Sequence, residues 1–529
     1  MTPAVVLATL LLNRPGPAIS PLIFGVSHAK EELRTGARIP LERWGGNRSS
    51  RFDWKTGNDA AGNDWFFANG GANAASPDTV WYHAALKHNA ELGIETLVTV
   101  PTIGWVARDN SSASFLVSRY GPQKRTDTQH PDWGNGERPD GTPITRNDPT
   151  DAGKRIDAAY IGEFVAYLKA TYGPASGPVR RAYALDNEPG LWHSTHRDVH
   201  PAPVTYDEAW RRTVEYASAI KDADPSAQVW GPVEWGWLGL KYSAADSVPG
   251  KGFAPAPDSK AHGADYFLHW YIRQLADYRK KTGRLLVDVI DVHDYPEVYV
   301  TGEGRIVAWD KPDGGSPVMQ RARLEAVRTW WDPTYKANGP GWTTWIDEPM
   351  YLLRRIQGWI KAECPELKLA VTEWDFGGRK VQNGALVHAL IFQALMQEGA
   401  YAAAEWGTPG PADASFHTYA LFRNYDGKGA AFTGTYIPGE SSDPAVTVFG
   451  ALDAGAKRLR VIVVNTDPAA AKPVSLNAGK VSATRVGAAW VLANTRPPHL
   501  EPVKLARPRK GRIAFNAPAY SVSLLDLPL

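Results

Sequence analysis

The chain has 529 residues, 43% of them hydrophobic, and this length predicts two domains rather than one. Its 58 basic and 56 acidic side chains leave a net charge of +2, which argues against nucleic acid or a membrane surface as a partner. A single cysteine, Cys364, excludes an internal disulfide, and 21 Trp with 21 Tyr favour carbohydrate binding, because flat rings stack on sugars.

The apolar run near the N-terminus, "AVVLATLLL" (4–12), is predicted to be a β-strand. It lacks the basic segment and the small-residue cleavage site of a signal peptide. It is also well short of the roughly 20 apolar residues that span a bilayer. We expect no membrane-spanning segment, and we expect a secreted, extracellular protein although no signal peptide is visible.

Eight short apolar runs alternate with amphipathic stretches over residues 21–430. The predicted strands are 21–27, 38–46, 94–102, 179–188, 227–236, 288–296, 367–375 and 400–407. The predicted helices are 80–93, 155–173, 205–225, 265–283, 348–365 and 385–400. Gly93 is placed to end the first of these helices, and Thr205 with Glu208 is placed to cap the third.

This alternation predicts an α/β fold, a TIM-like (β/α)8 barrel. A doubly wound open sheet is the alternative, but no Gly-rich phosphate-binding motif follows the first strand. After about residue 430 the pattern changes to strand-like alternation with turn residues, which predicts an all-β sandwich. The expected domains are therefore a catalytic barrel at 21–430 and a sandwich at 431–529, to which the strand within 1–20 adds.

The predicted barrel strands end in residues suited to chemistry, and ligands bind at the carboxyl ends of parallel strands. The strand 179–188 ends in Asp186, Asn187 and Glu188, and Pro189 stops it because proline cannot donate to the sheet. The other strand ends carry Arg43, Trp44 and Asn47; His293, Asp294 and Tyr295; Glu373, Trp374 and Asp375; and Glu405 with Trp406. Two facing acids among aromatic and amide side chains indicate a glycosidase, in which one acid protonates the leaving oxygen and the other attacks the sugar or activates water.

Five stretches resemble glycoside hydrolase family 44: "RWGGNRSSRFDWKTGNDAAGNDWFF" (43–67), "YALDNEPGLW" (183–192), "DVHDYPE" (291–297), "LAVTEWDFGG" (369–378) and "LFRNYDG" (421–427). The resemblance implies a TIM-like barrel with a β-sandwich and endo-acting β-1,4-glucanase or xyloglucanase activity. It also implies that Glu188 is the general acid/base and Glu373 the nucleophile. A retaining outcome follows if the two carboxyl groups lie about 5–5.5 Å apart.

Supporting roles follow from this pairing. The charge of Glu373 and partial burial are expected to raise the pKa of Glu188 and keep it protonated. Asn187 is placed to bond the sugar 2-hydroxyl, Tyr295 to orient Glu373, and Trp406 to form the floor of the sugar site. The residues predicted to bind or support substrate are Asn187, Tyr295, His293, Trp406, Arg43, Trp44, Asn47, Trp65, Trp192 and Trp374.

Several residues have structural alternatives. Asp186 is expected either to support the reacting residues from behind or to pair with an arginine such as Arg181, rather than to react itself. Glu405 is expected to pair with Arg43, and His293 and Tyr295 are as consistent with ordinary core packing as with a site. His193, His196 and His200 raise the hypothesis of zinc, but no cysteine accompanies them, so packing of a substrate loop is favoured and no metal ligand is assigned. Tryptophans at strand ends or in loops can be platforms or packing: Trp44, Trp54, Trp65, Trp192, Trp235, Trp237, Trp331 and Trp374.

The main hypothesis is a retaining endo-glycosidase acting by double displacement on β-1,4-glucan, with xyloglucan or xylan as further substrates. An inverting or transglycosylating enzyme and a non-catalytic glycan-binding protein on a hydrolase scaffold are the alternatives. Catalysis by two carboxyl groups requires no cofactor. A structural calcium ion in a long loop is compatible with the fold, although no loop has EF-hand spacing, and we expect a monomer.

Overall fold

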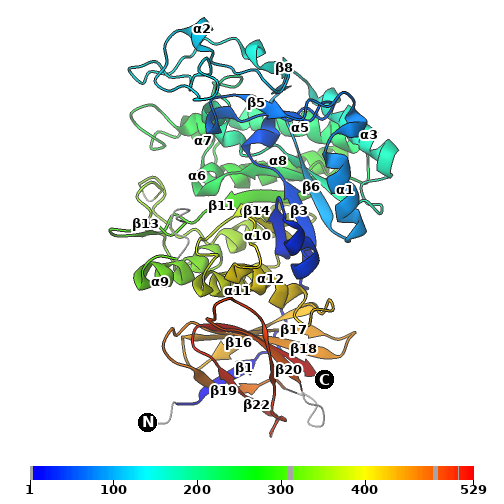
Figure 1. Ribbon diagram of the computed structural model, residues 1–529, viewed down its shortest axis with the longest axis vertical. Coiled ribbons are helices and arrows are strands. Elements are labelled where there is room, and N and C mark those ends of the chain that lie inside the picture. The colour runs from blue at the N-terminus through cyan, green and yellow to red at the C-terminus, as the bar shows by residue number, and fades with distance from the viewer. Residues whose placement is uncertain (1–3, 308–313, 343, 480–486, 510) are drawn as a thin grey trace. The chain divides into compact units, whose positions relative to one another are not determined.

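The computed structural model describes residues 4–307, 314–342, 344–479, 487–509 and 511–529 (Figure 1). The chain divides into two compact units. One comprises residues 1–41, 295–357 and 374–529, and the other comprises residues 42–294 and 358–373. Among the described residues, no helix has the length and apolar character needed to cross a membrane.

In the described part of the chain, eight strands close into a barrel in the order β10-β11-β14-β15-β2-β3-β6-β9. They are β2 (Gly25–Ser27), β3 (Leu41–Trp44), β6 (Glu95–Val100), β9 (Arg181–Leu185), β10 (Gln228–Glu234), β11 (Val289–Asp294), β14 (Lys368–Trp374) and β15 (Ala402–Glu405). Each lies within one of the eight predicted runs. All five residues of β9 are buried, as expected of a parallel strand covered on both faces.

The six predicted helices are confirmed, and each follows a barrel strand. They are α1 (Tyr82–Glu91), α3 (Ala158–Tyr172), α5 (Tyr206–Ala223), α8 (Phe267–Thr282), α10 (Leu352–Glu363) and α11 (Gln382–Gln397). Gly93 lies just beyond α1 with φ +72°, which glycine adopts without strain. A helix that the sequence analysis missed, α12 (Ala414–Arg423), follows β15.

The remaining short elements lie mostly in loops that follow barrel strands. The helices are α2 (Val117–Tyr120), α4 (Trp192–Thr195), α6 (Gly236–Lys241), α7 (Pro257–Ala261) and α9 (Pro317–Ala326). The strands form the hairpins β4 (Asn58–Ala60) with β5 (Asn69–Gly71), β7 (Trp105–Ala107) with β8 (Gly153–Arg155), and β12 (Tyr299–Val300) with β13 (Gly304–Arg305). The hairpins follow β3, β6 and β11, so they extend the carboxyl-terminal side of the barrel.

The C-terminal part of the chain forms a largely antiparallel sheet, with nine strands among the described residues, in the order β21-β20-β23-β18-β17-β16-β1-β19-β22. They are β1 (Val6–Leu10), β16 (Thr435–Ser441), β17 (Val446–Asp453), β18 (Arg458–Asn465), β19 (Lys472–Asn477), β20 (Ala488–Leu492), β21 (Glu501–Lys504), β22 (Arg512–Ala517) and β23 (Ser521–Pro528). Apolar side chains from strands at both ends of this order share one core, as in a sandwich. Residues 480–486, part of a predicted strand region, lie outside the described residues.

The apolar run near the N-terminus belongs to this sheet, as predicted. β1 pairs antiparallel with β16 and parallel with β19. Its alternate residues Val6, Ala8 and Leu10 are buried in the shared core, which explains the apolar character of the run.

Candidate active site

The turn after β9 places three polar residues in succession at the carboxyl end of the barrel. Asp186 and Glu188 have φ values of +72° and +48°, a left-handed conformation that costs a non-glycine residue of order 1 kcal/mol or more. The backbone N–H of Glu188 donates to the carbonyl of Val233 at 3.0 Å. Pro189 then begins a short 3-10 helix, Pro189–Leu191. The strand therefore ends at Leu185, three residues before the predicted end at Glu188, because the backbone turns at Asp186.

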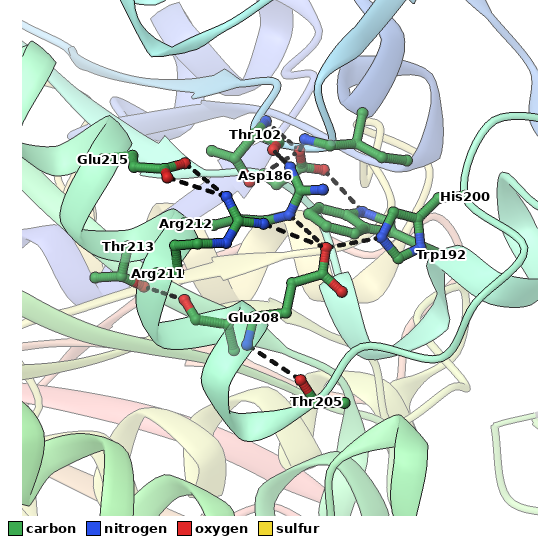
Figure 2. A network of polar contacts seen from close by, with 12 residues as sticks. Thr102, Asp186, Trp192, His200, Thr205, Glu208, Arg211, Arg212, Thr213 and Glu215 are labelled. Carbon is green, nitrogen blue, oxygen red and sulfur yellow. Dashed lines mark hydrogen bonds and ion pairs between the residues drawn. The ribbon is translucent and has the colours of Figure 1, made fainter.

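Asp186 is a structural residue of this turn. Its buried carboxylate accepts hydrogen bonds from the backbone N–H groups of Thr102 and Ile103 and from Trp192 Nε1 at 3.2 Å (Figure 2). Of the two alternatives predicted for Asp186, the pairing with Arg181 is wrong. Arg181 Nε donates instead to the Tyr183 hydroxyl at 2.9 Å, at the opposite end of the strand.

Helix α5 supports the turn through a second polar network. Thr205 accepts from the backbone N–H of Glu208 at 3.1 Å, as the predicted cap requires. The Glu208 carboxylate accepts from Arg212 Nε at 2.8 Å and lies 3.0 Å from His200 Nε2 (Figure 2). Burial raises the pKa of Glu208, but these two partners outweigh it and lower that pKa to about 2. The Arg212 guanidinium also lies over the Trp192 ring.

Arg43 joins two of the predicted site residues. Its Nη1 donates to Glu373 Oε2 at 2.7 Å, and its Nη2 donates to Asn187 Oδ1 at 2.7 Å. The backbone N–H of Gly46 adds a bond to the same Asn187 oxygen at 3.1 Å. A Cβ at Gly45 would lie 2.4 Å from the Arg43 guanidinium carbon, so this close approach requires glycine.

His293 lies between the two predicted catalytic carboxyl groups. Its Nδ1 is 3.0 Å from Glu188 Oε1 and 3.6 Å from Glu373 Oε2. A carboxylate oxygen of each glutamate and a ring nitrogen of His293 all lie within 4.8 Å of one another. The exposed fraction of each carboxyl side chain is small, 13% for Glu188 and 9% for Glu373. His293 therefore contacts both carboxyl groups, and its role toward substrate stays a prediction.

Burial sets the protonation of this cluster. It raises the pKa of Glu188 to about 7, against the lowering effect of Arg43 and with a further increase from Asp64. The direction agrees with the sequence prediction, but the principal cause is burial rather than the charge of Glu373. Burial also lowers the pKa of His293 to about 3, so its imidazole is neutral at ordinary pH.

The tryptophans predicted to bind substrate differ in how much of each side chain is exposed. Trp192 and Trp374 are 1% and 0% exposed, so neither offers a ring face to a sugar. Trp192 packs under the Glu188 turn, and Trp44 packs edge-on against Phe52 and Trp81. Trp65 is 54% exposed.

Trp65 lines an open pocket of about 250 Å³. The other lining residues are Asn63, Asp64, Phe66, Phe67, Arg125, Thr126, Asp127, Thr128 and Asn135. Asp64 accepts from Asn47 Nδ2 at 3.0 Å, and Asn47 Oδ1 accepts from Asn187 Nδ2 at 3.2 Å. A hydrogen-bonded path therefore connects this pocket to the carboxyl cluster.

A second open pocket, of about 230 Å³, begins at Gly190, two residues after Glu188. Aromatic and polar side chains line it, among them His193, Trp235, Tyr242, Ser243 and Phe253. The Tyr242 and Phe253 rings are stacked with centroids 5.0 Å apart.

The three histidines considered for zinc have separate environments. His196 Nε2 lies 2.9 Å from the Asn47 carbonyl, His200 contacts Glu208, and His193 lines the second pocket. Packing of a substrate loop stays the prediction for them.

Glu405 lies 3.1 Å from His388 Nε2, which replaces its predicted partnership with Arg43, since the Arg43 fork engages Glu373 and Asn187. The Trp406 ring makes an edge contact with His28, and the backbone N–H of Trp406 donates to the Trp374 carbonyl. The roles of Tyr295 and Trp406 toward substrate stay predictions.

Glu234 is a further acid at this edge of the barrel, and it was not among the residues predicted from the sequence. It ends β10 as Glu188 follows β9, and it is buried with its Oε2 3.3 Å from the Gly190 backbone nitrogen. An acid at the end of a neighbouring barrel strand, directly before Trp235, was the available signal.

Comparisons with known proteins show which family and which solved structures this chain resembles. The family model of glycoside hydrolase family 44 matches residues 58–298. A crystal structure described as CelM2, a bifunctional glucanase-xylanase from a metagenome library, is 33% identical, with 99% of each chain covered and a TM-score of 0.90.

Two curated relatives are also similar. Beta-mannanase/endoglucanase A of Caldicellulosiruptor saccharolyticus is 32% identical over 83% of this chain and 32% of its own length. Endoglucanase A of Paenibacillus lautus is 31% identical over 80% of this chain and 58% of its own length. The chain thus spans about a third and just over half of the lengths of these two relatives.

Proposed function

Since this chain belongs to glycoside hydrolase family 44, we propose that it is a retaining endo-acting glycoside hydrolase that cleaves β-1,4-glucan backbones by double displacement. The observation that carries the proposal is the pairing of Glu188 and Glu373, whose nearest oxygens lie within 4.8 Å. Inverting enzymes need about 6.5–9.5 Å between their carboxyl groups to admit a water, whereas retaining enzymes need about 5–5.5 Å.

In the first step, Glu373 attacks the anomeric carbon while Glu188 gives its proton to the leaving glycosidic oxygen. The bond to the leaving sugar breaks, and an ester forms between Glu373 and the remaining sugar. Glu188 is suited to donate because burial raises its pKa to about 7. Glu373 is held for attack by the Arg43 bond at 2.7 Å.

In the second step, Glu188 removes a proton from water, and the water oxygen replaces Glu373 on the anomeric carbon. Esterification removes the negative charge that Arg43 pairs with, so the guanidinium charge then acts on Glu188 with less compensation. Arg43 already lowers the pKa of Glu188. The same arginine therefore favours the ionised form of Glu188 more strongly once the ester has formed, which is when Glu188 acts as the base.

The two pockets can be assigned to the sugars on either side of the cleaved bond. The pocket beside Gly190 adjoins the residue that protonates the leaving group, so we assign Trp235 and its neighbours to leaving-group sugars. The Trp65 pocket connects through Asp64 and Asn47 to Asn187, which is placed to bond the 2-hydroxyl of the attacked sugar. We assign it to sugars on the retained side.

An assay of reducing ends over carboxymethyl cellulose, xyloglucan, xylan and mannan tests the proposal. We expect release from soluble β-1,4-glucan, with viscosity falling faster than reducing ends appear, because an endo-acting enzyme cuts internally. Binding of these glycans without release of sugar would instead identify a glycan-binding protein on a hydrolase scaffold. Activity on xyloglucan or xylan would define the tolerated backbones and branches.

The remaining expectations are part of the same proposal. We propose that the catalytic barrel comprises residues 21–430 and the sandwich residues 431–529 with the N-terminal strand. We propose a secreted monomer whose chemistry needs no cofactor. A structural calcium ion stays a prediction, which metal analysis of the purified protein checks.

A further inference from the structure

Glu234 is a buried acid that the two catalytic steps do not use. It is the last residue of β10, which pairs with β9, and it is 3% exposed. Its Oε2 accepts the backbone N–H of Gly190 at 3.3 Å. Gly190 lies in the short helix that begins directly after Glu188.

The end of β10 holds the Glu188 turn at two points. The register between β10 and β11 shifts between Pro232 and Glu234, and Val233 in that shift has a left-handed φ of +61°. The Val233 carbonyl accepts from the N–H of Glu188 at 3.0 Å, and the adjacent Glu234 carboxyl accepts from Gly190. One irregularity in β10 thus supplies both acceptors to the strained turn.

The carboxyl group fits closely between two glycines. A Cβ added to Gly190 would lie 2.6 Å from Glu234 Oε2, and one added to Gly239 would lie 3.2 Å from the same atom. A side chain at Gly190 would displace the carboxyl group, and one at Gly239 would crowd it. The length of the Glu234 side chain therefore suits its contact with the Gly190 backbone.

We propose that Glu234 is a positioning residue for Glu188, which fixes the turn at Gly190 and so the direction from which Glu188 delivers its proton to the leaving oxygen. This inference rests on the proposed function of Glu188 as the acid. Proton delivery depends steeply on geometry, because a displacement of about 1 Å can cost about 100-fold in rate.

The role depends on reach rather than on proton exchange. Burial raises the pKa of Glu234 to about 8, with a further increase from the nearby Glu188, so Glu234 is neutral while Glu188 is the acid. A glutamine has the same length as a neutral glutamic acid and keeps an oxygen acceptor for Gly190. An aspartate keeps the acid but is one methylene shorter and cannot reach Gly190 from the same backbone.

The experiment compares Glu234→Gln, Glu234→Asp and the surface control Glu215→Asp on two substrates. Glu215 lies on α5, where its exposed carboxylate accepts from Arg211. One is a cello-oligosaccharide, whose leaving group needs a proton, and the other is an aryl β-cellobioside with an acidic phenol, which leaves without one. We expect Glu234→Asp to lower kcat/KM at least about tenfold on the oligosaccharide and less than threefold on the aryl substrate. Glu234→Gln and the control are expected to stay within threefold of the parent on both. Thermal unfolding of each variant establishes that it is folded.

Three results would overturn the inference. Equal losses on both substrates in Glu234→Asp would indicate a general structural role, and unchanged activity in that variant would indicate none. A loss in Glu234→Gln as large as in Glu234→Asp would mean that the acid exchanges a proton. If Glu234→Asp does not fold, Gly190→Ala displaces the same contact and carries the same expectation. A parent that hydrolyses neither substrate would refute the proposed function itself, which separates the two failures.

Discussion

Arg43 and Glu373 form a buried ion pair, with Nη1 of the arginine 2.7 Å from Oε2 of the glutamate. The same guanidinium binds Asn187, the neighbour of Glu188, so one rigid fork connects the ends of β9 and β14. An arginine without exposed surface is costly unless its donors are used, and the two bonds explain why it is retained.

Replacing Arg43 with lysine is expected to lower kcat/KM while the protein stays folded. A lysine keeps the positive charge but cannot bond Glu373 and Asn187 at once from one planar group. Loss of one charge-assisted hydrogen bond is worth about 2 kcal/mol, or roughly a thirtyfold decrease in kcat/KM. Steady-state kinetics with matched circular dichroism measures this, and activity equal to the parent would show that the fork is dispensable.

Replacing Glu188 with glutamine is expected to have an effect that depends on the leaving group. Natural glycans need the proton and should lose about 10²–10⁴-fold in kcat/KM, whereas an aryl glycoside with an acidic phenol should still form the glycosyl-enzyme. Kinetics on the two substrates checks this. Losses of the same size on both would contradict the acid role.

The pH dependence should identify Glu188 directly. Because the acid must be protonated and its pKa is raised to about 7, kcat/KM on natural glycans should fall as the pH increases through about 7. His293 does not account for this decrease, since its pKa is lowered to about 3 and it is neutral throughout. In Glu188→Gln, assayed on an activated aryl glycoside, the decrease should vanish. Its persistence there would assign it to another group, with Glu234, whose pKa is raised to about 8, tested next.

Trp65 should contribute to substrate binding rather than to the chemical step. Its ring is 54% exposed beside an open pocket, so removal leaves no cavity in the core. An aromatic contact of about 1 kcal/mol predicts that Trp65→Ala raises KM for long glucans about fivefold with little change in kcat or thermal stability. Trp192→Ala is the contrasting variant, because its ring is buried and its loss should lower the unfolding midpoint. A KM unchanged in Trp65→Ala would exclude the ring as a platform.

The barrel and the pairing of Glu188 with Glu373 could be predicted because each rests on a local pattern. Buried parallel strands give continuous apolar runs, and polar residues directly after them must lie at the carboxyl edge. The strand ends at 186–188 and 373–375 therefore indicated the site before any contact was known.

Partnerships between distant residues could not be predicted in the same way. Asp186 was matched to Arg181 by closeness in sequence, but alternate residues of a strand face opposite sides, and the turn carries Asp186 toward Thr102 and Trp192. Burial of Trp192 and Trp374 depends on which loops cover them, and the contact of Glu234 with Gly190 depends on a register shift in β10. None of these contacts or burial patterns produces a repeating pattern of residues that can be recognised in the sequence.

The account depends most on Glu373 forming a covalent ester with the sugar. Incubation with a 2-deoxy-2-fluoro-β-cellobioside carrying an acidic leaving group slows the second step and accumulates that ester. Peptide mapping by mass spectrometry should then find one fluorosugar adduct, on the peptide containing Glu373 and on that residue. An adduct on another residue, or none while the enzyme still hydrolyses the unfluorinated substrate, would contradict double displacement through Glu373.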